Sequence, residues 1–278
     1  MTRLLGHEAD TDHVRSGPLA AGLVGAAHIG PTLAVTLLAT LYAASVGLDP
    51  QRAVLVTAAV LTGQLSIGWS NDLVDVRRDQ AVARADKPLA TGELSVTSVR
   101  TACGLAVLLT VLLSLACGAL AGLVHLGCVA AGWAYNLGLK STVLSWLPYA
   151  VAFGGIPVFV SLAAPGGGLP LAEVPAAGAL LGIGAHLVNV LPDLRDDAAT
   201  GVRGLPHRLG EWRTRLLAVV VLVAATALLA IGASSPVLLP IVVGVAALAA
   251  VALVGRGAAP FRAAVGIAAA DVLLLVLR

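Results

Sequence analysis

Long apolar segments alternate with short polar ones along most of the chain. A helix needs about 20 mostly apolar residues to cross the hydrocarbon core of a bilayer, and Gly, Pro and charged residues mark the breaks between such segments. The expected helices occupy residues 18–46, 52–73, 97–117, 119–138, 142–163, 174–193, 214–233, 236–254 and 261–277. The pattern therefore predicts an all-α, polytopic membrane bundle of nine transmembrane helices.

The first residues of the chain differ from the rest because they are polar. Glu8, Asp10 and Asp12 lie where a signal peptide would have a basic and then an apolar region. We therefore expect residues 1–17 to form a cytoplasmic tail and residues 18–278 to form a single transmembrane domain.

Composition agrees with a membrane protein. Hydrophobic residues make up 58% of the 278 residues and charged residues only 12%, whereas soluble domains carry about 25% charged residues. The mean hydropathy is +0.95. The formal net charge of +2 is too small to indicate nucleic-acid binding, so no nucleic-acid partner is expected.

Basic residues predict the orientation of the bundle. With the N-terminus inside, the tail and the loops after the second, fourth, sixth and eighth helices hold all 17 Lys and Arg residues except Arg52 and Arg278. Cytoplasmic loops of membrane proteins are enriched in these residues. We expect an integral protein of the cell membrane whose N-terminus and acidic loops are cytoplasmic.

An acidic motif, NDLVDVRRDQAVARADKPLATG, follows the second predicted helix at residues 71–92. Asn71, Asp75 and Asp79 are spaced by four residues, so on a helix they would share one face. Asp72 lies three residues before Asp75 and would extend that face. Carboxylates at the C-terminal end of a helix are destabilised by the helix dipole and by one another. A bound cation would compensate for both effects.

A second acidic motif, NVLPDLRDDAATGVRGLPHRLG, follows the sixth predicted helix at residues 189–210. Asp193 and Asp197 are four residues apart, and both motifs emerge on the same side of the membrane. All-oxygen ligands suit a hard ion such as Mg²⁺, which usually binds a few carboxylates together with substrate phosphate oxygens. The basic residues of these loops could bind the rest of a phosphate group: Arg84, Lys87, Lys140 and Arg203.

Four segments resemble motifs of the UbiA superfamily of intramembrane prenyltransferases. NDLVDVRRD resembles the NDxxDxxxD motif, and RADKPLATGELS resembles the R-x-x-K/R-P-x-x-x-G stretch that follows it. DLRDDAATGVRGLPHRLG resembles the second motif, DxxxD followed by G-x-x-S/T-L-x-x-x-L/G, and AYNLGLKST resembles a Tyr-then-Lys segment after the fourth helix. The resemblance covers nearly the whole chain. It implies a nine-helix bundle around a central, lipid-accessible cavity that two Asp-rich loops cap at the cytoplasmic mouth.

The resemblance also implies roles for individual residues. Asp75, Asp193 and Asp197 would be catalytic, and the Mg²⁺ ligands would be Asn71, Asp72, Asp75, Asp79, Asp193 and Asp197. Contacts to the diphosphate would come from Arg84, Lys87, Tyr135 and Lys140, with Arg203 as a further candidate. The chain departs from the second motif at Gly201, where some members have a third Asp, and at Arg203-Gly204, where x-S/T is usual.

The implied chemistry is ionisation of a prenyl diphosphate at the mouth and transfer of the isoprenoid chain inside the bundle. Mg²⁺, Lys and Arg would neutralise the leaving group, and an apolar interior would keep water from the allylic cation. Polar residues within the spans are candidates to meet the acceptor or line the cavity: His28, Gln64, His186 and Asn189. The acceptor, expected to be aromatic or another small molecule, and the prenyl chain length are not encoded in any motif.

Two alternatives remain at this point. A membrane terpene cyclase would use the same Mg²⁺–diphosphate ionisation without an acceptor, although aromatic residues, which stabilise carbocations, make up only 4% of the chain. A transporter would hold its charged residues near the middle of the bilayer. Here the carboxylates gather at one surface, which favours the enzyme.

Overall fold

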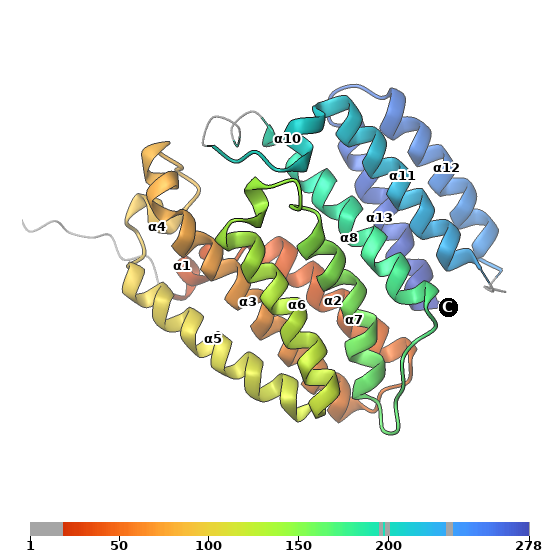
Figure 1. The fold of residues 1–278 in the computed structure, drawn as a ribbon, viewed down its shortest axis with the longest axis horizontal. Helices are drawn as coiled ribbons and strands as arrows, with labels where there is room; N and C mark the ends of the chain where they lie inside the picture. Colours follow the sequence, from red (N-terminus) through yellow and green to blue (C-terminus); the bar gives the residue numbers. More distant parts are fainter. Residues whose placement is uncertain (1–18, 195–196, 198–200, 232–235, 278) are drawn as a thin grey trace, which may run out of the picture.

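The computed structural model describes residues 19–194, 197, 201–231 and 236–277, and within these ranges every regular element is a helix. The predicted tail, residues 1–17, lies outside the described residues. The elements are α1 (Leu19–Ala26), α2 (Ile29–Ser45), α3 (Pro50–Ala81), α4 (Pro88–Thr91), α5 (Val96–Ala116), α6 (Ala119–Leu137), η1 (Leu139–Ser141), α7 (Leu147–Ala163), α8 (Glu173–Val190), α10 (Leu205–Leu209), α11 (Glu211–Ala230), α12 (Leu238–Val254) and α13 (Ala259–Leu277). In Figure 1, α3, α5 and α6 form one side of the bundle, α11, α12 and α13 form the other, and α7 and α8 lie between them.

Six of the described helices are long and apolar enough to cross a membrane, namely α3, α5, α6, α8, α11 and α13. α1 and α2 together pass the same test as a pair bent by 73°, and α7 and α12 are apolar but shorter. The predicted all-α integral membrane bundle is therefore confirmed. That all nine predicted segments cross the bilayer stays a prediction.

The first predicted helix, 18–46, is wrong as a single element because it is broken at His28. His28 adopts a left-handed conformation with φ of 49°, which interrupts the helix between α1 and α2. The break packs on α3 at Gly68, where a Cβ atom would lie 2.4 Å from the Ala27 carbonyl oxygen. Only glycine permits this approach, so Gly68 positions the break, and with it His28, against α3.

The second predicted helix, 52–73, is too short. Its observed counterpart α3 begins at Pro50, after the N-cap Asp49, and continues to Ala81. The first acidic motif is therefore largely helical and does not lie in a loop. Asp72, Asp75 and Asp79 are all at most 5% exposed, and the ion pair of Asp75 with Lys140 of η1 ties the part of the helix beyond residue 73 to a neighbouring element.

Two further helix boundaries differ from the prediction because of proline. The helix predicted at 142–163 begins only at Leu147, where Pro148 occupies its first turn, a position in which proline is tolerated. The helix predicted at 174–193 ends as α8 at Val190, shortly before Pro192. Both changes shorten the helices at the end of the bundle that carries the acidic motifs.

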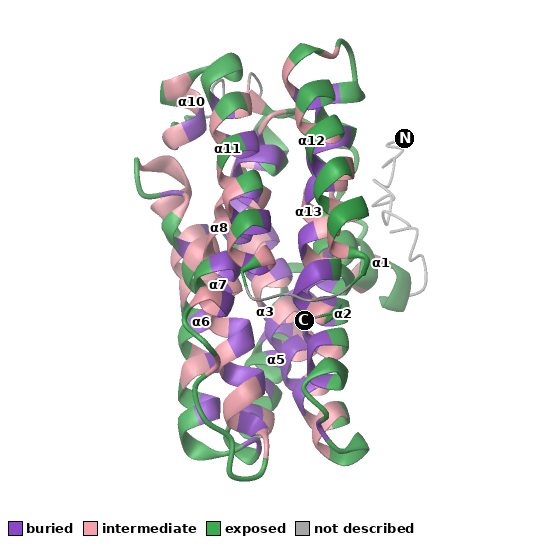
Figure 2. Cartoon of the chain, turned by 90° about the vertical axis from the view of Figure 1, so that its right-hand side faces the viewer, coloured by how far each residue is buried: buried purple, intermediate pink, exposed green. Residues whose placement is uncertain are grey.

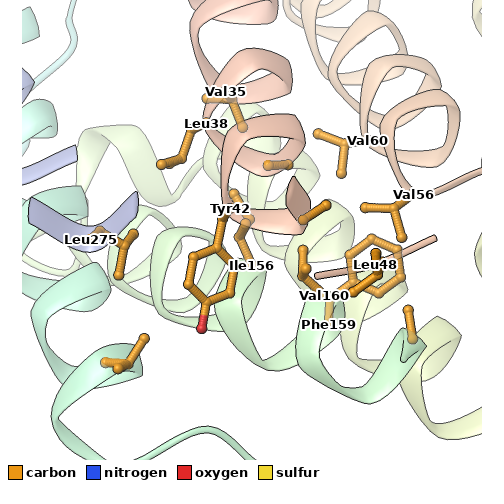
Figure 3. Close-up of a cluster of buried hydrophobic side chains, with 14 of the residues drawn as sticks. Val35, Leu38, Tyr42, Leu48, Val56, Val60, Ile156, Phe159, Val160 and Leu275 are labelled. Atoms are coloured by element: carbon orange, nitrogen blue, oxygen red, sulfur yellow. The ribbon is translucent and has the colours of Figure 1, made fainter. Parts of the chain in front are cut away.

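The main hydrophobic core lies in the half of the bundle remote from the acidic motifs. Tyr42 of α2, Val56 of α3 and Phe159 of α7 belong to it (Figure 3). Buried residues face the inside of the bundle and exposed residues its outside (Figure 2). Many of the exposed residues are large and apolar, as expected for a bundle surrounded by lipid.

Small residues allow α7 and α8 to pack closely. A Cβ atom at Gly182 of α8 would lie 2.4 Å from the Tyr149 carbonyl oxygen, and one at Gly178 would lie 2.7 Å from that of Phe153. Close contact through small residues is typical of membrane helices. It brings the aromatic side chains of α7 next to the last turns of α8.

A cavity of about 380 Å³ lies between α3, α5 and α6. Its lining is almost wholly apolar: Ser66, Val107, Thr110, Val111, Leu126, Val129, Ala130, Trp133, Ala134 and Leu137. The hydroxyl groups of Ser66 and Thr110 donate to backbone carbonyls of their own helices. This cavity is not the central one implied by the family resemblance, which stays a prediction.

Candidate active site

Asp75 of α3 lies at the centre of a compact group of charges. Lys140 of η1 donates to both of its carboxylate oxygens, at 2.7 Å and 2.6 Å, and Arg78 donates to Oδ2 at 2.9 Å. Arg78 lies one turn further along the same helix, whereas Lys140 lies in η1, which directly follows the C-terminal end of α6. The carboxylate is thus held by two cations in a largely buried position.

Asp72 forms a second group of charges one turn earlier. Its Oδ1 lies 2.7 Å from Lys87 Nζ and 2.8 Å from His28 Nε2. His28 Nε2 is also 2.8 Å from Lys87 Nζ and 3.2 Å from Asn71 Nδ2. The break between α1 and α2 and the start of α4 therefore meet at the first motif. Among the described residues, the buried Oδ2 of Asp72 has no hydrogen-bond partner.

Arg84 lies within the first motif, shortly after the end of α3. Its backbone N–H donates to the Asp79 carbonyl at 3.0 Å, and its guanidinium donates to both oxygens of Asp86 at 2.8 Å. This hydrogen-bonded pair raises the pKa of Arg84, and the carboxylates of Asp79 and Asp193 add to the shift. The same pair lowers the pKa of Asp86 to about 2. The charge of Arg84 therefore interacts with a carboxylate of each motif, Asp79 and Asp193.

The second motif follows α8 and is more open than the first. Asp193 is exposed, and Asp197 is half-buried with Oδ2 3.8 Å from His207 Nε2. The Asp197 N–H donates to the Asp193 carbonyl at 2.9 Å, a helical spacing that places both side chains on one face. Burial and the charge of Asp193 raise the pKa of Asp197, while His207, Arg78 and Lys140 oppose that rise.

The two motifs therefore share cations. Lys140 binds Asp75 directly and also acts on the charge of Asp197, and Arg78 does the same. Arg84 acts on Asp79 and Asp193. Two segments that are far apart in the sequence thus meet at one end of the bundle.

Gly204 and Ser145 join the segment after the second motif to the segment that carries Lys140. A Cβ atom at Gly204 would lie 2.5 Å from the Lys140 carbonyl oxygen and 2.8 Å from Ser145 Oγ. The Leu205 N–H donates to Ser145 Oγ at 3.0 Å, and that oxygen lies 3.0 Å from His186 Nε2. The Gly204 that departs from the second-motif pattern is thus the residue that allows this close contact.

An aromatic cluster lies next to the shared charges. Tyr149 packs edge-on to Tyr135 at 5.3 Å between ring centroids, lies 4.9 Å from the ring of His186, and stacks with Phe153 at 6.4 Å. Tyr135 is close enough to Asp75 and Asp197 for both charges to act on its hydroxyl. The cluster therefore connects the charged end of the bundle to its apolar interior.

The donor set fits a hard divalent cation. The side chains that converge carry carboxylate or amide oxygens, and Asp72 Oδ2 is a buried carboxylate oxygen that accepts no hydrogen bond from the described residues. Within the described part of the chain, however, no three His, Cys, Asp or Glu side chains are already arranged around one metal position. Lys87, Lys140 and Arg78 hold the carboxylates instead, so a metal ion that takes the position of a lysine beside Asp72 Oδ1 or Asp75 would require that lysine ion pair to be exchanged.

The remaining predicted site residues are Gln64, Asn189 and Arg203. Gln64 is half-buried on α3, two turns before Asn71, and Asn189 is exposed in the last turn of α8. Arg203 is exposed, and its carbonyl accepts from Arg208 Nε at 3.2 Å. Among the described residues, no ion pair joins Arg203 to the carboxylates, and its role as a diphosphate contact stays a prediction.

Several residues of the site were not expected from the sequence. Arg78 could have been identified from its i+3 spacing to Asp75. Ser145, Tyr149 and His207 carry no such signal, because each joins the site only through the packing of elements distant in the sequence.

Comparison with known proteins agrees with the motifs. Residues 32–265 match the model of the UbiA prenyltransferase family. The 33 kDa chain of a bacteriochlorophyll synthase from Cereibacter sphaeroides is 33% identical over 201 residues. That match covers 66% of this chain and 65% of the relative, just under two thirds of the relative's length.

Solved structures share the fold. The apo structure of a UbiA homologue from Aeropyrum pernix K1 superimposes with a TM-score of 0.70 at 17% identity, over 94% of this chain and 98% of that chain. A UbiA homologue from Archaeoglobus fulgidus bound to GPP and Mg²⁺ gives a TM-score of 0.68 at 18% identity, over 92% of this chain and 99% of that chain. The family predicted from the motifs is confirmed.

Proposed function

Because the chain belongs to the UbiA prenyltransferase family, we propose that it is a Mg²⁺-dependent intramembrane enzyme that ionises a prenyl diphosphate and transfers the isoprenoid chain to a small acceptor. The single observation that carries this proposal is the packing of the segment after the second motif on the turn that holds Lys140: Gly204 lies against the Lys140 carbonyl, and the Lys140 side chain binds Asp75. The homologue with GPP and Mg²⁺ supports the choice of substrate and metal.

We assign the metal to the carboxylates at the shared end of the bundle. Asn71, Asp75, Asp193 and Asp197 are the principal ligands, and Asp72 and Asp79 assist them. Mg²⁺ bound there would neutralise the charge that develops on the diphosphate as the carbon–oxygen bond breaks. Since these side chains come from α3 and from the segment after α8, the leaving group would lie between the two segments.

The basic residues hold the leaving group in this proposal. Lys87 and Lys140 each carry an ammonium group close to a carboxylate, and Arg84 presents a planar guanidinium suited to phosphate oxygens. The cluster of Tyr135, Tyr149 and Phe153 is placed to receive the allylic end, because ring faces stabilise cations. The apolar interior below it would exclude water.

The cyclase alternative is retained for one reason. The 4 Trp, 3 Tyr and 3 Phe residues are few, but two Tyr and one Phe gather in a single cluster beside the charges. Such a cluster could guide a carbocation that is quenched by a double bond of its own chain. The transferase remains the leading proposal because of the family.

The test is an assay of the purified protein in lipid nanodiscs with geranyl diphosphate. Mg²⁺ should support release of diphosphate, and chelation should stop it. Products are identified by mass spectrometry with and without a panel of aromatic acceptors, to which an acceptor related to bacteriochlorophyll is added because of the relative's name. Prenylated acceptor supports the transferase, terpene formed without acceptor supports the cyclase, and no release of diphosphate under any condition refutes both.

The orientation is part of the proposal. The bundle lies in the cell membrane with its N-terminus and both acidic motifs on the cytoplasmic side, as the distribution of Lys and Arg indicates. Labelling of single cysteines introduced beside Asp86 and in the loop before α8, in intact and in opened cells, would check this.

A further inference from the structure

The ion pairs of the first motif indicate which species the site binds. Both oxygens of Asp75 are engaged by Lys140, at 2.7 Å and 2.6 Å, and Asp72 Oδ1 is engaged by Lys87 at 2.7 Å. An ammonium group that bridges both oxygens of a carboxylate occupies the side from which a metal ion would approach. A metal ion therefore has to displace Lys140 before it can bind Asp75 on that side.

A lysine displaced in this way needs a new anion. The Lys140 side chain is 10% exposed and that of Lys87 is 13% exposed, so neither ammonium group can rely on water for solvation. Breaking a buried ion pair is costly because it leaves an uncompensated charge. A free metal ion would impose this cost, since it brings no anion for the lysine.

A metal–diphosphate complex removes that cost. The metal binds the carboxylates, and the phosphate oxygens accept the ammonium groups that the carboxylates release. Diphosphate without metal would draw the lysines away from two buried carboxylates, so that Asp75 would keep only Arg78 and Asp72 only His28. Each component alone thus breaks ion pairs, whereas the complex exchanges them for equivalent ones.

The two lysines are suited to such an exchange. Each lies outside α3, on a flexible side chain with a compact charge: Lys140 in the single turn of η1, and Lys87 just before α4. Arg78, in contrast, is fixed to the same helix as Asp75 and can keep its contact with Oδ2 throughout. The exchange therefore involves the lysines and leaves Arg78 in place.

We propose that Lys140 and Lys87 hold the metal-binding carboxylates Asp75 and Asp72 until a metal–diphosphate complex arrives, and that the site binds this complex in preference to free metal or free diphosphate. This inference rests on the proposed metal-dependent function and names the form in which the substrate enters. It predicts strong positive coupling between metal and diphosphate binding.

The test uses Mn²⁺ as the metal probe and inorganic diphosphate as the anion. Electron paramagnetic resonance measures the Mn²⁺ bound to the full-length protein in nanodiscs, with corrections for the Mn²⁺ bound by diphosphate in solution. The wild type should bind Mn²⁺ at least about tenfold more tightly when diphosphate is present. The Lys140→Met variant should bind Mn²⁺ without diphosphate at least about tenfold more tightly than the wild type does, because the competing charge is gone.

Two further variants make the result decisive. Lys87→Met should act in the same direction at Asp72, so the inference can be tested even where Lys140→Met does not fold. Arg215→Met removes a cation that is paired with Glu211 on α11 and should leave Mn²⁺ binding unchanged. Melting temperatures of all variants report whether the fold is retained.

The outcomes separate this inference from the proposed function. If the wild type binds Mn²⁺ only weakly without diphosphate and the lysine variants bind it more tightly, the inference is supported. If the wild type binds Mn²⁺ with diphosphate but neither lysine variant gains affinity without it, the exchange is refuted and the metal-dependent function stands. If no variant binds Mn²⁺ even with diphosphate, both are refuted.

Discussion

The two carboxylate motifs face the same end of the bundle but are built differently. The first lies largely on α3, where Asp72 and Asp75 are buried and paired with Lys87, Lys140, Arg78 and His28. The second follows the end of α8, and there Asp193 is exposed and Asp197 is only half-buried.

This difference indicates a division of roles. The first motif contributes to the stability of the protein, because its ion pairs connect α3 to η1, to α4 and to the break between α1 and α2. The second motif is less constrained by the fold, and burial together with the charge of Asp193 raises the pKa of Asp197. We infer that the second motif gains most from the arrival of a metal–diphosphate complex, whereas the first must give up existing partners.

Neutralising a principal carboxylate should have the largest effect on activity, and the effect should be similar for both motifs. Asp75→Asn and Asp197→Asn each remove a metal ligand charge, so Mg²⁺-dependent release of diphosphate from geranyl diphosphate should fall about a thousandfold. Glu211→Gln, at an exposed carboxylate on α11, is the control and should retain activity. Near wild-type turnover in either Asp variant would refute the assignment of that residue.

The same two variants should differ in stability. Asp75→Asn leaves Lys140 buried without its anion, a change that typically costs about 3–5 kcal/mol of unfolding free energy. Asp197→Asn should be neutral or slightly stabilising, because the raised pKa of Asp197 means that the folded protein disfavours its charge. Unfolding in mild detergent, followed by circular dichroism, compares them. Equal losses of stability would contradict the distinction between the motifs.

A smaller effect is expected at the junction between the motifs. Gly204→Ala would place a Cβ atom 2.5 Å from the Lys140 carbonyl oxygen and push the second motif away from η1. A displacement of about 1 Å costs on the order of a hundredfold in turnover. Gly104→Ala is the matched control, since a Cβ atom there would meet no atom of the described part of the chain within 4 Å. Equal turnover of the two variants in the diphosphate-release assay would show that this close contact is not needed.

The smallest effect should follow the loss of an exposed ion pair. Arg84 and Asp86 form two good hydrogen bonds, but their side chains are 44% and 61% exposed. Exposed pairs contribute about 0–1 kcal/mol, so Asp86→Asn should barely change the unfolding free energy. The same unfolding experiment measures this change. A loss as large as that of Asp75→Asn would show that burial does not govern the strength of these pairs.

The sequence predicts the positions of the charged residues well and their contacts poorly. Spacing by three and four residues correctly places Asp72, Asp75 and Asp79 on one helix face, and hydropathy gives the helical order. Spacing cannot show that Asp72 and Asp75 pair with Lys87 and Lys140, because those lysines lie in other parts of the chain.

The remaining differences have the same origin. The break at His28 packs on Gly68 of α3, and the whole of α2 separates these two residues in the sequence. The two motifs come close where Gly204 packs on Ser145, which is also distant in the sequence. Long-range contacts of this kind leave no local pattern. Arg203 is the opposite case: its position in the second motif suggests a contact with the diphosphate, but its side chain is exposed in the structure.

The central claim is that both carboxylate motifs hold one metal–diphosphate complex. The most direct measurement is anomalous X-ray scattering from crystals grown with Mn²⁺ and geranyl thiolodiphosphate, which locates each metal ion. The account predicts Mn²⁺ bound by oxygens of Asp75 and of the second motif around a shared diphosphate, with Lys140 moved from the carboxylate to a phosphate oxygen. Mn²⁺ bound by one motif alone, with Lys140 still on Asp75, would contradict it.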